Sequence, residues 1–322
     1  MIVCVHSLVA GRSGGGCRMA VYPSVVDAIR DGQRLSAAMT LKFAVNALPL
    51  GGGKSVLAVR ELLTGKRRRE LLHAFGSFLE TLGGIYGAGP DMNTSDEDMD
   101  IIGEVTPYVY CRTTSSDGTG DTALDTTMGV FHGIVATVRH VLGTSLNGCR
   151  VVVQGLGGVG APLAERLLAA GANVCGTDVS ADKLAALAER GVVPLAPQDA
   201  LDTECDVLVP CALGGVLNAK TIPRLRCRIV AGAANNQLAE PADAERLRQR
   251  GIVYAPDFVI NSGGVLHGMG FDALGWSRAE LDRRLVAIGD TLIRIYAEAD
   301  QANCTTDAAA KQLAEEMRAP LP

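Results

Sequence analysis

The sequence predicts an α/β protein of two domains, the second built on a doubly wound parallel sheet. Three observations carry this prediction. The chain has 322 residues, which is enough for two separate hydrophobic cores. Its second half alternates short apolar runs with helical patterns, the order from which parallel sheets are built. A glycine-rich turn joins one apolar run to a helix within residues 149–170, as expected where such a sheet begins.

Composition excludes several classes of protein. Hydrophobic residues make up 48% of the chain and charged residues 20%, which predicts a packed globular protein. An aromatic share of 4%, the single Trp276 and a net charge of −5 argue against nucleic-acid binding. We find no signal peptide pattern and no apolar run long enough for a membrane span. The nine cysteines include no Cys-x-x-Cys pair, so we expect reduced thiols in a cytoplasmic protein and no metal site.

The first 126 residues form the expected substrate and catalytic domain. Apolar patterns predict a strand at residues 2–5 and helices at residues 26–43 and 70–82. Three glycine-rich segments between them are expected as loops or turns, at residues 11–18, 49–53 and 86–95. The polar residues 111–125 are expected as a hinge, followed by residues 127–289 as the nucleotide domain. The helices of about residues 290–322 are expected to pack back on the first domain.

Two lysines, Lys42 and Lys54, flank the glycine-rich turn of residues 49–53. Ammonium groups that lie close together lower each other's pKa, and burial lowers it further, so one lysine could act as a base near pH 7. Leu48 stands where a P-loop would need its first glycine, so this is not a P-loop. The residues alone also permit a solvated lysine on a surface turn. Asp91 follows a proline and by itself reads as a turn former.

A dinucleotide fingerprint begins the second domain. An apolar strand at residues 149–154 leads into Gly-x-Gly-x-x-Gly, then a helix at residues 161–170 and a strand at residues 173–177. Asp178 at the end of that strand would accept hydrogen bonds from the adenosine ribose and repel a 2′-phosphate, which favours NAD over NADP. The alternative is a similar sheet that binds no nucleotide. The expected nucleotide-binding residues of the fingerprint are Gly155, Leu156, Gly157, Gly158, Val159 and Gly160.

Three more strands are expected, at residues 206–210, 228–231 and 252–254. The carboxyl ends of such strands bind ligands in open parallel sheets. We therefore expect ligand contacts from the loops that follow them, at Cys211, Ala212, Asn235 and Asn261. Asn235 and Asn261 could meet the nicotinamide amide or the substrate.

Several motifs occur in one order along nearly the whole chain. They are Gly-Gly-x-Arg-Met at residues 15–19, Met-Thr-x-Lys at 39–42, Leu-Gly-Gly-Gly-Lys at 50–54, Pro-Asp-Met-Asn-Thr at 90–94, Val-Gln-Gly-Leu-Gly at 153–157, Pro-Cys-Ala-Leu-Gly at 210–214, Ala-Asn-Asn-Gln-Leu at 234–238 and Tyr-Ala-Pro-Asp-Phe-Val-Ile-Asn-Ser-Gly-Gly at 254–264. With these motifs the chain resembles the Glu/Leu/Phe/Val dehydrogenase family, most closely its leucine, valine and phenylalanine branch.

The resemblance implies reversible oxidative deamination of an L-amino acid to a 2-oxo acid and ammonia, with NAD as the hydride acceptor. It implies an amino-acid dehydrogenase domain and a Rossmann domain with a cleft between them. Lys42 would hold the substrate carboxylate with help from Asn261. Lys54 would activate the attacking water and stabilise the developing oxygen charge, and Asp91 would carry protons to and from the amino group.

The resemblance also indicates which residues would contact the substrate side chain, namely Gly14, Gly15, Val265 and Gly268. Gly14 stands where glutamate-specific members carry a lysine, and Gly268 where the leucine branch carries a branched apolar residue. We therefore expect an apolar substrate side chain of leucine size or larger, aromatic ones included. A glutamate-type dehydrogenase and an NAD-binding protein without turnover are the alternatives. The chain begins later than typical members, and we expect a homodimer or a higher homo-oligomer.

Overall fold

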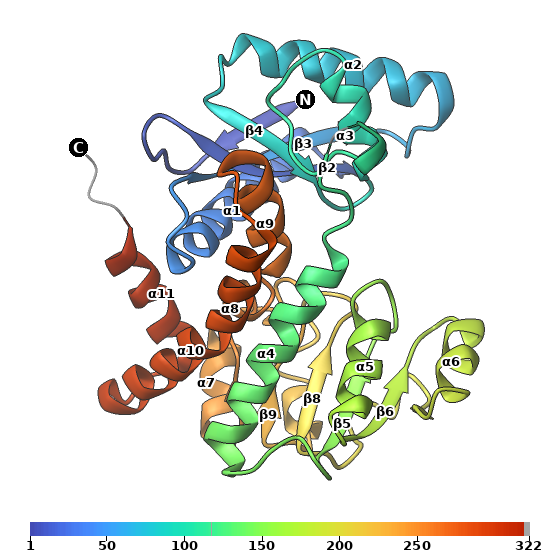
Figure 1. Ribbon diagram of the computed structural model, residues 1–322, viewed down its shortest axis with the longest axis vertical. Coiled ribbons are helices and arrows are strands. Elements are labelled where there is room, and N and C mark those ends of the chain that lie inside the picture. The colour runs from blue at the N-terminus through green and yellow to red at the C-terminus, as the bar shows by residue number, and fades with distance from the viewer. Residues whose placement is uncertain (117, 319–322) are drawn as a thin grey trace. The chain divides into compact units, whose positions relative to one another are not determined.

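The computed structural model describes residues 1–116 and 118–318 (Figure 1). The chain divides into two compact units. Unit 1 comprises residues 1–122, residues 265–277 and the described residues from 314 onward, and unit 2 comprises residues 123–264 and 278–313. This division differs from the expected domain boundaries, because helix α10 (Arg278–Ala302) and the first part of helix α11 (Thr306–Met317) group with unit 2.

Unit 1 is built on a four-stranded mixed sheet. Its strands lie in the order β1 (Ile2–Val5), β3 (Gly51–Val59), β2 (Ser13–Val21) and β4 (Tyr86–Pro90). Strand β1 runs antiparallel to β3, whereas β2 runs parallel to both of its neighbours. Helix α1 (Val25–Val45) covers one face of this sheet, and helices α2 (Gly65–Thr81) and α3 (Asp96–Gly103) cover the other (Figure 1).

The three glycine-rich segments expected as loops or turns lie largely in strands. Residues 13–18 belong to β2, residues 51–53 open β3, and residues 86–90 are β4. The glycines are needed because backbones pass unusually close together here. A Cβ atom at Gly15 would lie 1.9 Å from the Gly53 carbonyl oxygen, and one at Gly52 would lie 2.2 Å from the Thr40 nitrogen in α1. The loop prediction was therefore wrong, since these glycines mark close packing rather than turns.

Helix α3 begins at a capping box that fixes the loop after β4. The Ser95 side chain accepts a hydrogen bond from the Asp98 nitrogen, and the Asp98 carboxylate accepts one from the Ser95 nitrogen at 2.9 Å. Arg68 of α2 donates through Nε to Asp98 Oδ1 at 2.7 Å and through Nη2 to the Asn93 carbonyl at 2.8 Å. Asp98 is 3% exposed, so its ion pair with Arg68 is largely shielded from water. This buried pair helps to hold the loop of residues 91–95 in place.

Unit 2 contains a six-stranded parallel sheet in the order β10-β9-β8-β5-β6-β7, which confirms the predicted doubly wound sheet. Its strands, in chain order, are β5 (Arg150–Gln154), β6 (Asn173–Thr177), β7 (Val193–Pro194), β8 (Val207–Pro210), β9 (Ile229–Val230) and β10 (Val253–Tyr254). The helices that follow or connect these strands are α5 (Gly160–Ala169), α6 (Ala181–Ala188), α7 (Ala242–Gln249) and α8 (Asp257–Ile260). Unit 2 therefore carries the sheet edge at which nucleotides are bound in this class of fold.

Helix α4 (Ala123–Leu142) packs closely against α10 within unit 2. Glycines permit the short distance: a Cβ atom at Gly289 would lie 2.9 Å from Ala136 Cβ, and one at Gly129 would lie 2.7 Å from Ile288 Cδ1. The Thr137 and Tyr296 hydroxyls meet at 2.8 Å in the same interface.

The remaining short elements are η1 (Thr114–Ser116), η2 (Ile222–Arg224), α9 (Gly263–Gly268) and the π-helical turn η3 (Met269–Ala273). Across the part of the chain that the structure describes, no helix combines the length and apolarity needed to cross a membrane.

Replacing Asp98 with alanine should lower the free energy of unfolding by about 3 kcal/mol, because the change removes a helix cap and leaves the Arg68 guanidinium without its buried partner. Urea unfolding of the wild type and the variant measures the difference. Glu97→Ala is the matched control, since this residue lies in the same helical turn but is exposed. Equal effects of the two substitutions would contradict a structural role for the Arg68–Asp98 pair.

Candidate active site

Lys54 and Asp91 meet in unit 1 although they lie on different strands. Lys54 is on β3 and Asp91 directly follows β4, and strand β2 lies between these two strands. The meeting point is at Gly16, where a Cβ atom would lie 2.7 Å from Asp91 Cβ and 2.9 Å from Lys54 Nζ. Lys54 Nζ donates to Asp91 Oδ2 at 3.0 Å. The absent side chain at residue 16 thus leaves the space in which the two predicted catalytic residues form an ion pair.

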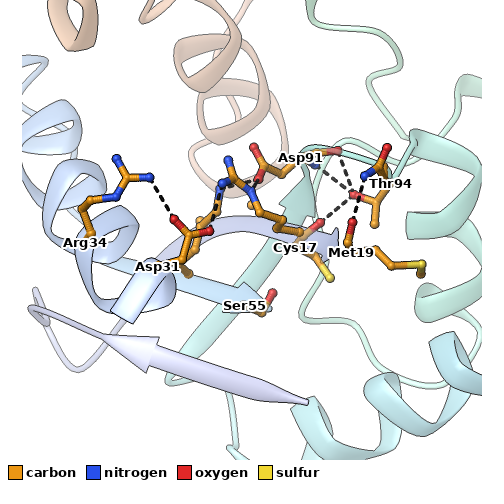
Figure 2. A network of polar contacts seen from close by, with 12 residues as sticks. Cys17, Met19, Asp31, Arg34, Ser55, Asp91 and Thr94 are labelled. Atoms are coloured by element: carbon orange, nitrogen blue, oxygen red, sulfur yellow. Dashed lines mark hydrogen bonds and ion pairs between the residues drawn. The ribbon is translucent and has the colours of Figure 1, made fainter. Parts of the chain in front are cut away.

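A second cation, Arg18, binds the same carboxylate. Arg18 Nε donates to Asp91 Oδ2 at 2.8 Å, and Arg18 Nη1 donates to Asp31 Oδ2 at 3.0 Å. Asp31 in turn accepts from Arg34 Nη2 at 2.8 Å and from the Tyr22 hydroxyl at 2.8 Å. Figure 2 shows this network, which extends from Arg34 past Asp31 to Asp91. Positive and negative groups alternate along it.

The surroundings of the ion pair shift both of its pKa values downward. Burial lowers the pKa of Lys54, which is 5% exposed; Asp91 opposes this shift, and the Arg18 charge adds to it. Burial raises the pKa of Asp91, but the Lys54 and Arg18 cations outweigh that effect and hold it below its usual value. Arg18 is therefore a cation that acts on the pKa of Lys54.

Neutral groups complete the surroundings of the pair. The Thr94 hydroxyl accepts a hydrogen bond from the Asp91 nitrogen at 2.9 Å and donates to the Cys17 carbonyl at 2.7 Å, which fixes the loop after β4 against β2. The Tyr86 hydroxyl donates to the Gly15 carbonyl at 2.8 Å. Burial raises the pKa of the Cys17 thiol to about 12 and the pKa of Tyr86 well above 10, so both are neutral near pH 7.

Lys42 lies in the last turn of α1, which confirms its predicted place near a helix end. Helix α1 packs against β3, the strand that carries Lys54. The Lys42 carbonyl accepts a hydrogen bond from Asn46 Nδ2 at 2.7 Å, which closes the end of the helix. Lys42 and Lys54 thus belong to the same unit and to adjoining elements.

The residues expected to contact the substrate side chain have different surroundings. A Cβ atom at Gly14 would make ordinary contacts of 3.6 to 3.7 Å with Phe43 and Met269 among others. A Cβ atom at Gly268 would lie 2.4 Å from Cys111 Sγ, so the thiol fills the space next to that glycine. Cys111 was not among the predicted site residues.

Gly15 and Val265 complete that set. Gly15 packs against Gly53, as described above, so its lack of a side chain is already required by the sheet. Val265 precedes Gly268 by three residues in α9, which places the two on the same side of the helix.

The glycine fingerprint of unit 2 lies between β5 and α5, as predicted. Gly155 has φ +97°, a conformation that favours glycine. A Cβ atom at Gly160 would lie 1.9 Å from the Gly155 carbonyl oxygen, whereas one at Gly157 would meet no atom within 4 Å. The first glycine thus forms the turn, the last permits close packing, and the middle one leaves an open backbone. These properties fit the pyrophosphate of a dinucleotide.

Asp178 is tied to this glycine turn. Its Oδ2 atom accepts from the Leu156 nitrogen at 2.7 Å, and its Oδ1 atom accepts from the Ser180 nitrogen at 2.9 Å. Burial raises the pKa of Asp178, but these backbone hydrogen bonds outweigh it and keep the carboxyl ionised. Val179 beside it is 95% exposed. A carboxylate at this position fits recognition of ribose hydroxyls.

The loops after β8 and β9 bring together the other predicted residues of unit 2. The Cys211 nitrogen donates to the Gln154 carbonyl at 2.7 Å, and a Cβ atom at Gly155 would lie 2.8 Å from Ala212 Cβ. Asn261 Nδ2 donates to Asn235 Oδ1 at 2.7 Å. Residues 211, 212 and 235 therefore lie in the loops after β8 and β9, as predicted, whereas Asn261 lies at the C-terminal cap of helix α8, which follows β10.

Sequence reasoning left open whether Arg18 is an anchor or a surface residue, because residues 11–18 were expected as a loop. The signal that could have identified it is strand alternation: side chains two residues apart share a face, so Gly16 and Arg18 point to the same side of β2. That side is the one on which Lys54 and Asp91 meet.

Replacing Lys54 with methionine should remove part of the pH dependence of stability. The folded state lowers the pKa of Lys54 below 10.5, so the unfolded state binds more protons between the folded pKa and 10.5. The wild type therefore gains stability as pH rises through this window, and the variant lacks that gain. Urea unfolding measures the free energy of unfolding of both proteins at pH 7 and pH 10.5. The wild-type value minus the variant value should be larger at pH 10.5.

The exposed Lys66 offers a control, because Lys66→Met removes the same kind of charge from the surface. If the difference in free energy of unfolding between the wild type and Lys54→Met does not grow with pH, burial does not lower the pKa of Lys54.

Comparisons with known proteins agree with this architecture. Residues 2–108 match the family model described as Glu/Leu/Phe/Val dehydrogenase, dimerisation domain, and residues 177–319 match that of Glutamate/Leucine/Phenylalanine/Valine dehydrogenase. Leucine dehydrogenase of Geobacillus stearothermophilus is 37% identical over 98% of this chain and 86% of its own length. Phenylalanine dehydrogenase of Caldalkalibacillus thermarum is 37% identical over 98% of this chain and 86% of its own.

Among solved structures, L-tryptophan dehydrogenase from Nostoc punctiforme superposes with a TM-score of 0.84. It is 34% identical to this chain, and the match covers 98% of this chain and 90% of the other. Both matched models describe one family, and the relatives named for leucine and phenylalanine are 37% identical over 98% of this chain. The chain therefore belongs to the Glu/Leu/Phe/Val dehydrogenase family, an amino acid dehydrogenase family.

Proposed function

We propose that this protein catalyses the reversible oxidative deamination of an apolar L-amino acid to a 2-oxo acid and ammonia with NAD. The observation that carries this proposal is the buried Lys54–Asp91 ion pair in a chain of the amino acid dehydrogenase family. A base and a water-activating amine of this kind suit a reaction that removes protons from an amino group and then hydrolyses an imine. Bound NAD would accept the hydride from the substrate α-carbon.

Side chains of this protein would bind the substrate and carry out the proton transfers. Lys42 and Asn261 hold the α-carboxylate of the substrate. Asp91, kept ionised by its two cations, accepts the proton that leaves the amino group. Lys54 in its neutral form takes a proton from the attacking water, and its ammonium form stabilises the oxygen charge that develops. The lowered pKa of Lys54 supports this role, because it brings the neutral form nearer to neutral pH.

The cofactor would be held by the fingerprint of residues 155–160 together with Asp178. The open backbone at Gly157 and the ionised Asp178 support this assignment. Cys211, Ala212 and Asn235 would contact the nicotinamide half, since they follow the ends of neighbouring strands.

The substrate side chain would lie beside Gly14, Val265 and Gly268. Phe43 and Met269 next to Gly14 support an apolar side chain over a carboxylate, because neither can balance a negative charge. The similar chains named for leucine, phenylalanine and tryptophan support side chains from leucine size up to aromatic ones.

We also propose a homo-oligomer, a dimer or larger, that works in the cytoplasm. The family description of residues 2–108 as a dimerisation domain supports self-association. The nine cysteines, none of which forms a disulfide in the part of the chain that the structure describes, suit a reducing compartment.

A panel of L-amino acids tests the reaction and its specificity together. NADH formation should be fastest with leucine, phenylalanine or tryptophan, with glutamate lower in kcat/KM by at least about 100-fold. Lys54→Ala should lose at least about 100-fold in kcat, because a general base contributes that much or more. A preference for glutamate would overturn the apolar pocket, and NAD binding without turnover of any amino acid would overturn the dehydrogenase proposal.

Replacing Asp178 with serine should shift the cofactor preference, because the change removes the charge that repels a 2′-phosphate. The ratio of kcat/KM for NADP to that for NAD should rise by at least about tenfold, equivalent to about 1.4 kcal/mol. Asp182→Ser, an exposed acid in the first turn of α6, provides the same charge change as a control. An unchanged ratio in the Asp178 variant would contradict its role in ribose recognition.

A further inference from the structure

We propose that Arg18 is a positioning residue of the reaction, which orients the Asp91 carboxylate and favours the neutral form of Lys54. Asp31 and Tyr22 hold the outer end of this guanidinium. The kinetic part of this proposal rests on the proposed function. The effect of Arg18 on the titration of Lys54 can be measured without turnover.

The first argument is the orientation of Asp91. Arg18 Nε and Lys54 Nζ both donate to Oδ2 of this carboxylate, at 2.8 and 3.0 Å. No donor among residues 1–116 and 118–318 reaches Oδ1. A guanidinium is planar and its donors point in fixed directions, so it fixes the carboxylate plane more firmly than an ammonium group can. Arg18 thus holds Asp91 with one oxygen engaged and Oδ1 open to a proton from the substrate amine.

The second argument is the charge of Lys54. Two cations share one anionic oxygen, so Arg18 takes up part of the attraction that would otherwise stabilise the Lys54 ammonium group. The permanent charge of Arg18 also repels a second positive charge nearby. Both effects favour the neutral amine at Lys54, and neither requires Arg18 to touch the substrate.

The third argument is that the end of the Arg18 guanidinium that does not contact Asp91 is also bound. Its side chain is 15% exposed, and Nη1 binds Asp31, which is anchored by the Tyr22 hydroxyl and by Arg34 of the same helix (Figure 2). Burial and the hydrogen bond to Asp31 raise the pKa of Tyr22 to about 12, so Tyr22 stays a neutral donor. An arginine with contacts on both ends cannot swing away from Asp91 without breaking several hydrogen bonds.

The other titratable groups that face the pair do not supply this effect. Cys17 on β2 and Tyr86 on β4 are neutral near pH 7, and Asp98 forms its own ion pair with Arg68. Among the described residues, Arg18 is therefore the cation besides Lys54 that forms an ion pair with Asp91.

The test is the titration of Lys54 followed by NMR of the full-length protein with ¹³Cε-labelled lysine, where Lys54→Arg assigns the signal. Arg18→Gln should raise the midpoint of the Lys54 titration by about one pH unit or more. Arg18→Lys, which keeps the charge, should restore most of the wild-type midpoint. Arg34→Gln removes a cation from the same Asp31 without touching Asp91, and should leave the midpoint unchanged. If Arg18→Gln does not fold, Arg18→Met keeps the packing of the stem and gives the same measurement.

The kinetic counterpart is the pH profile of kcat/KM for the best amino acid of the panel. The acid limb should move to higher pH in Arg18→Gln by the same amount as the Lys54 midpoint, whereas a merely structural role would lower the rate at every pH without moving the limb. A Lys54 midpoint unchanged in Arg18→Gln and Arg18→Met, or shifted equally by Arg34→Gln, overturns the proposal. Absence of turnover with a shifted midpoint overturns the proposed function alone.

Discussion

The site depends on one electrostatic constraint: a lysine ammonium group that is almost fully buried must share a carboxylate with a second cation. Taking charge out of water is costly, and only close ionic partners offset that cost. Among the residues that the structure describes, the ionic partner of Lys54 is Asp91, and Arg18 binds the same oxygen of that carboxylate. The chain thereby keeps Asp91 ionised while it holds Lys54 in a state from which a proton leaves easily. A reaction that moves protons in both directions needs this combination.

Close backbone packing makes that arrangement possible. Gly16 is free of a side chain at the point where Lys54 and Asp91 meet, and Gly15 and Gly52 let β3 approach its neighbours. The same device recurs in unit 2, where Gly160 lies against the Gly155 carbonyl. In both units glycine brings backbone or charged groups together that any larger residue would hold apart. Substitutions at these glycines would therefore disturb the sites before they disturb the hydrophobic cores.

The sequence predicted unit 2 better than unit 1 for a physical reason. Alternating apolar strands and helices define a parallel sheet, and the fingerprint of residues 155–160 with Asp178 has a spacing that few other structures require. The glycine-rich strands of unit 1 carry no such signal, because a glycine in a turn and a glycine in a crowded strand look alike in one sequence. The two-lysine pattern already marked Lys54 as a possible base, and the family resemblance then assigned roles to Lys54 and Asp91. The contact of Arg18 with Asp91 was not predicted, because it joins residues 73 positions apart and depends on the strand order β3-β2-β4.

The most direct test of this account is a crystal structure with NAD and the 2-oxo acid product of the best panel substrate. The account predicts that the oxygen on C2 of the product lies within hydrogen-bond distance of Lys54 Nζ, with Asp91 still bound to Arg18 through Oδ2. A product bound away from Lys54, or an Asp91 carboxylate turned away from both cations in that complex, would contradict it.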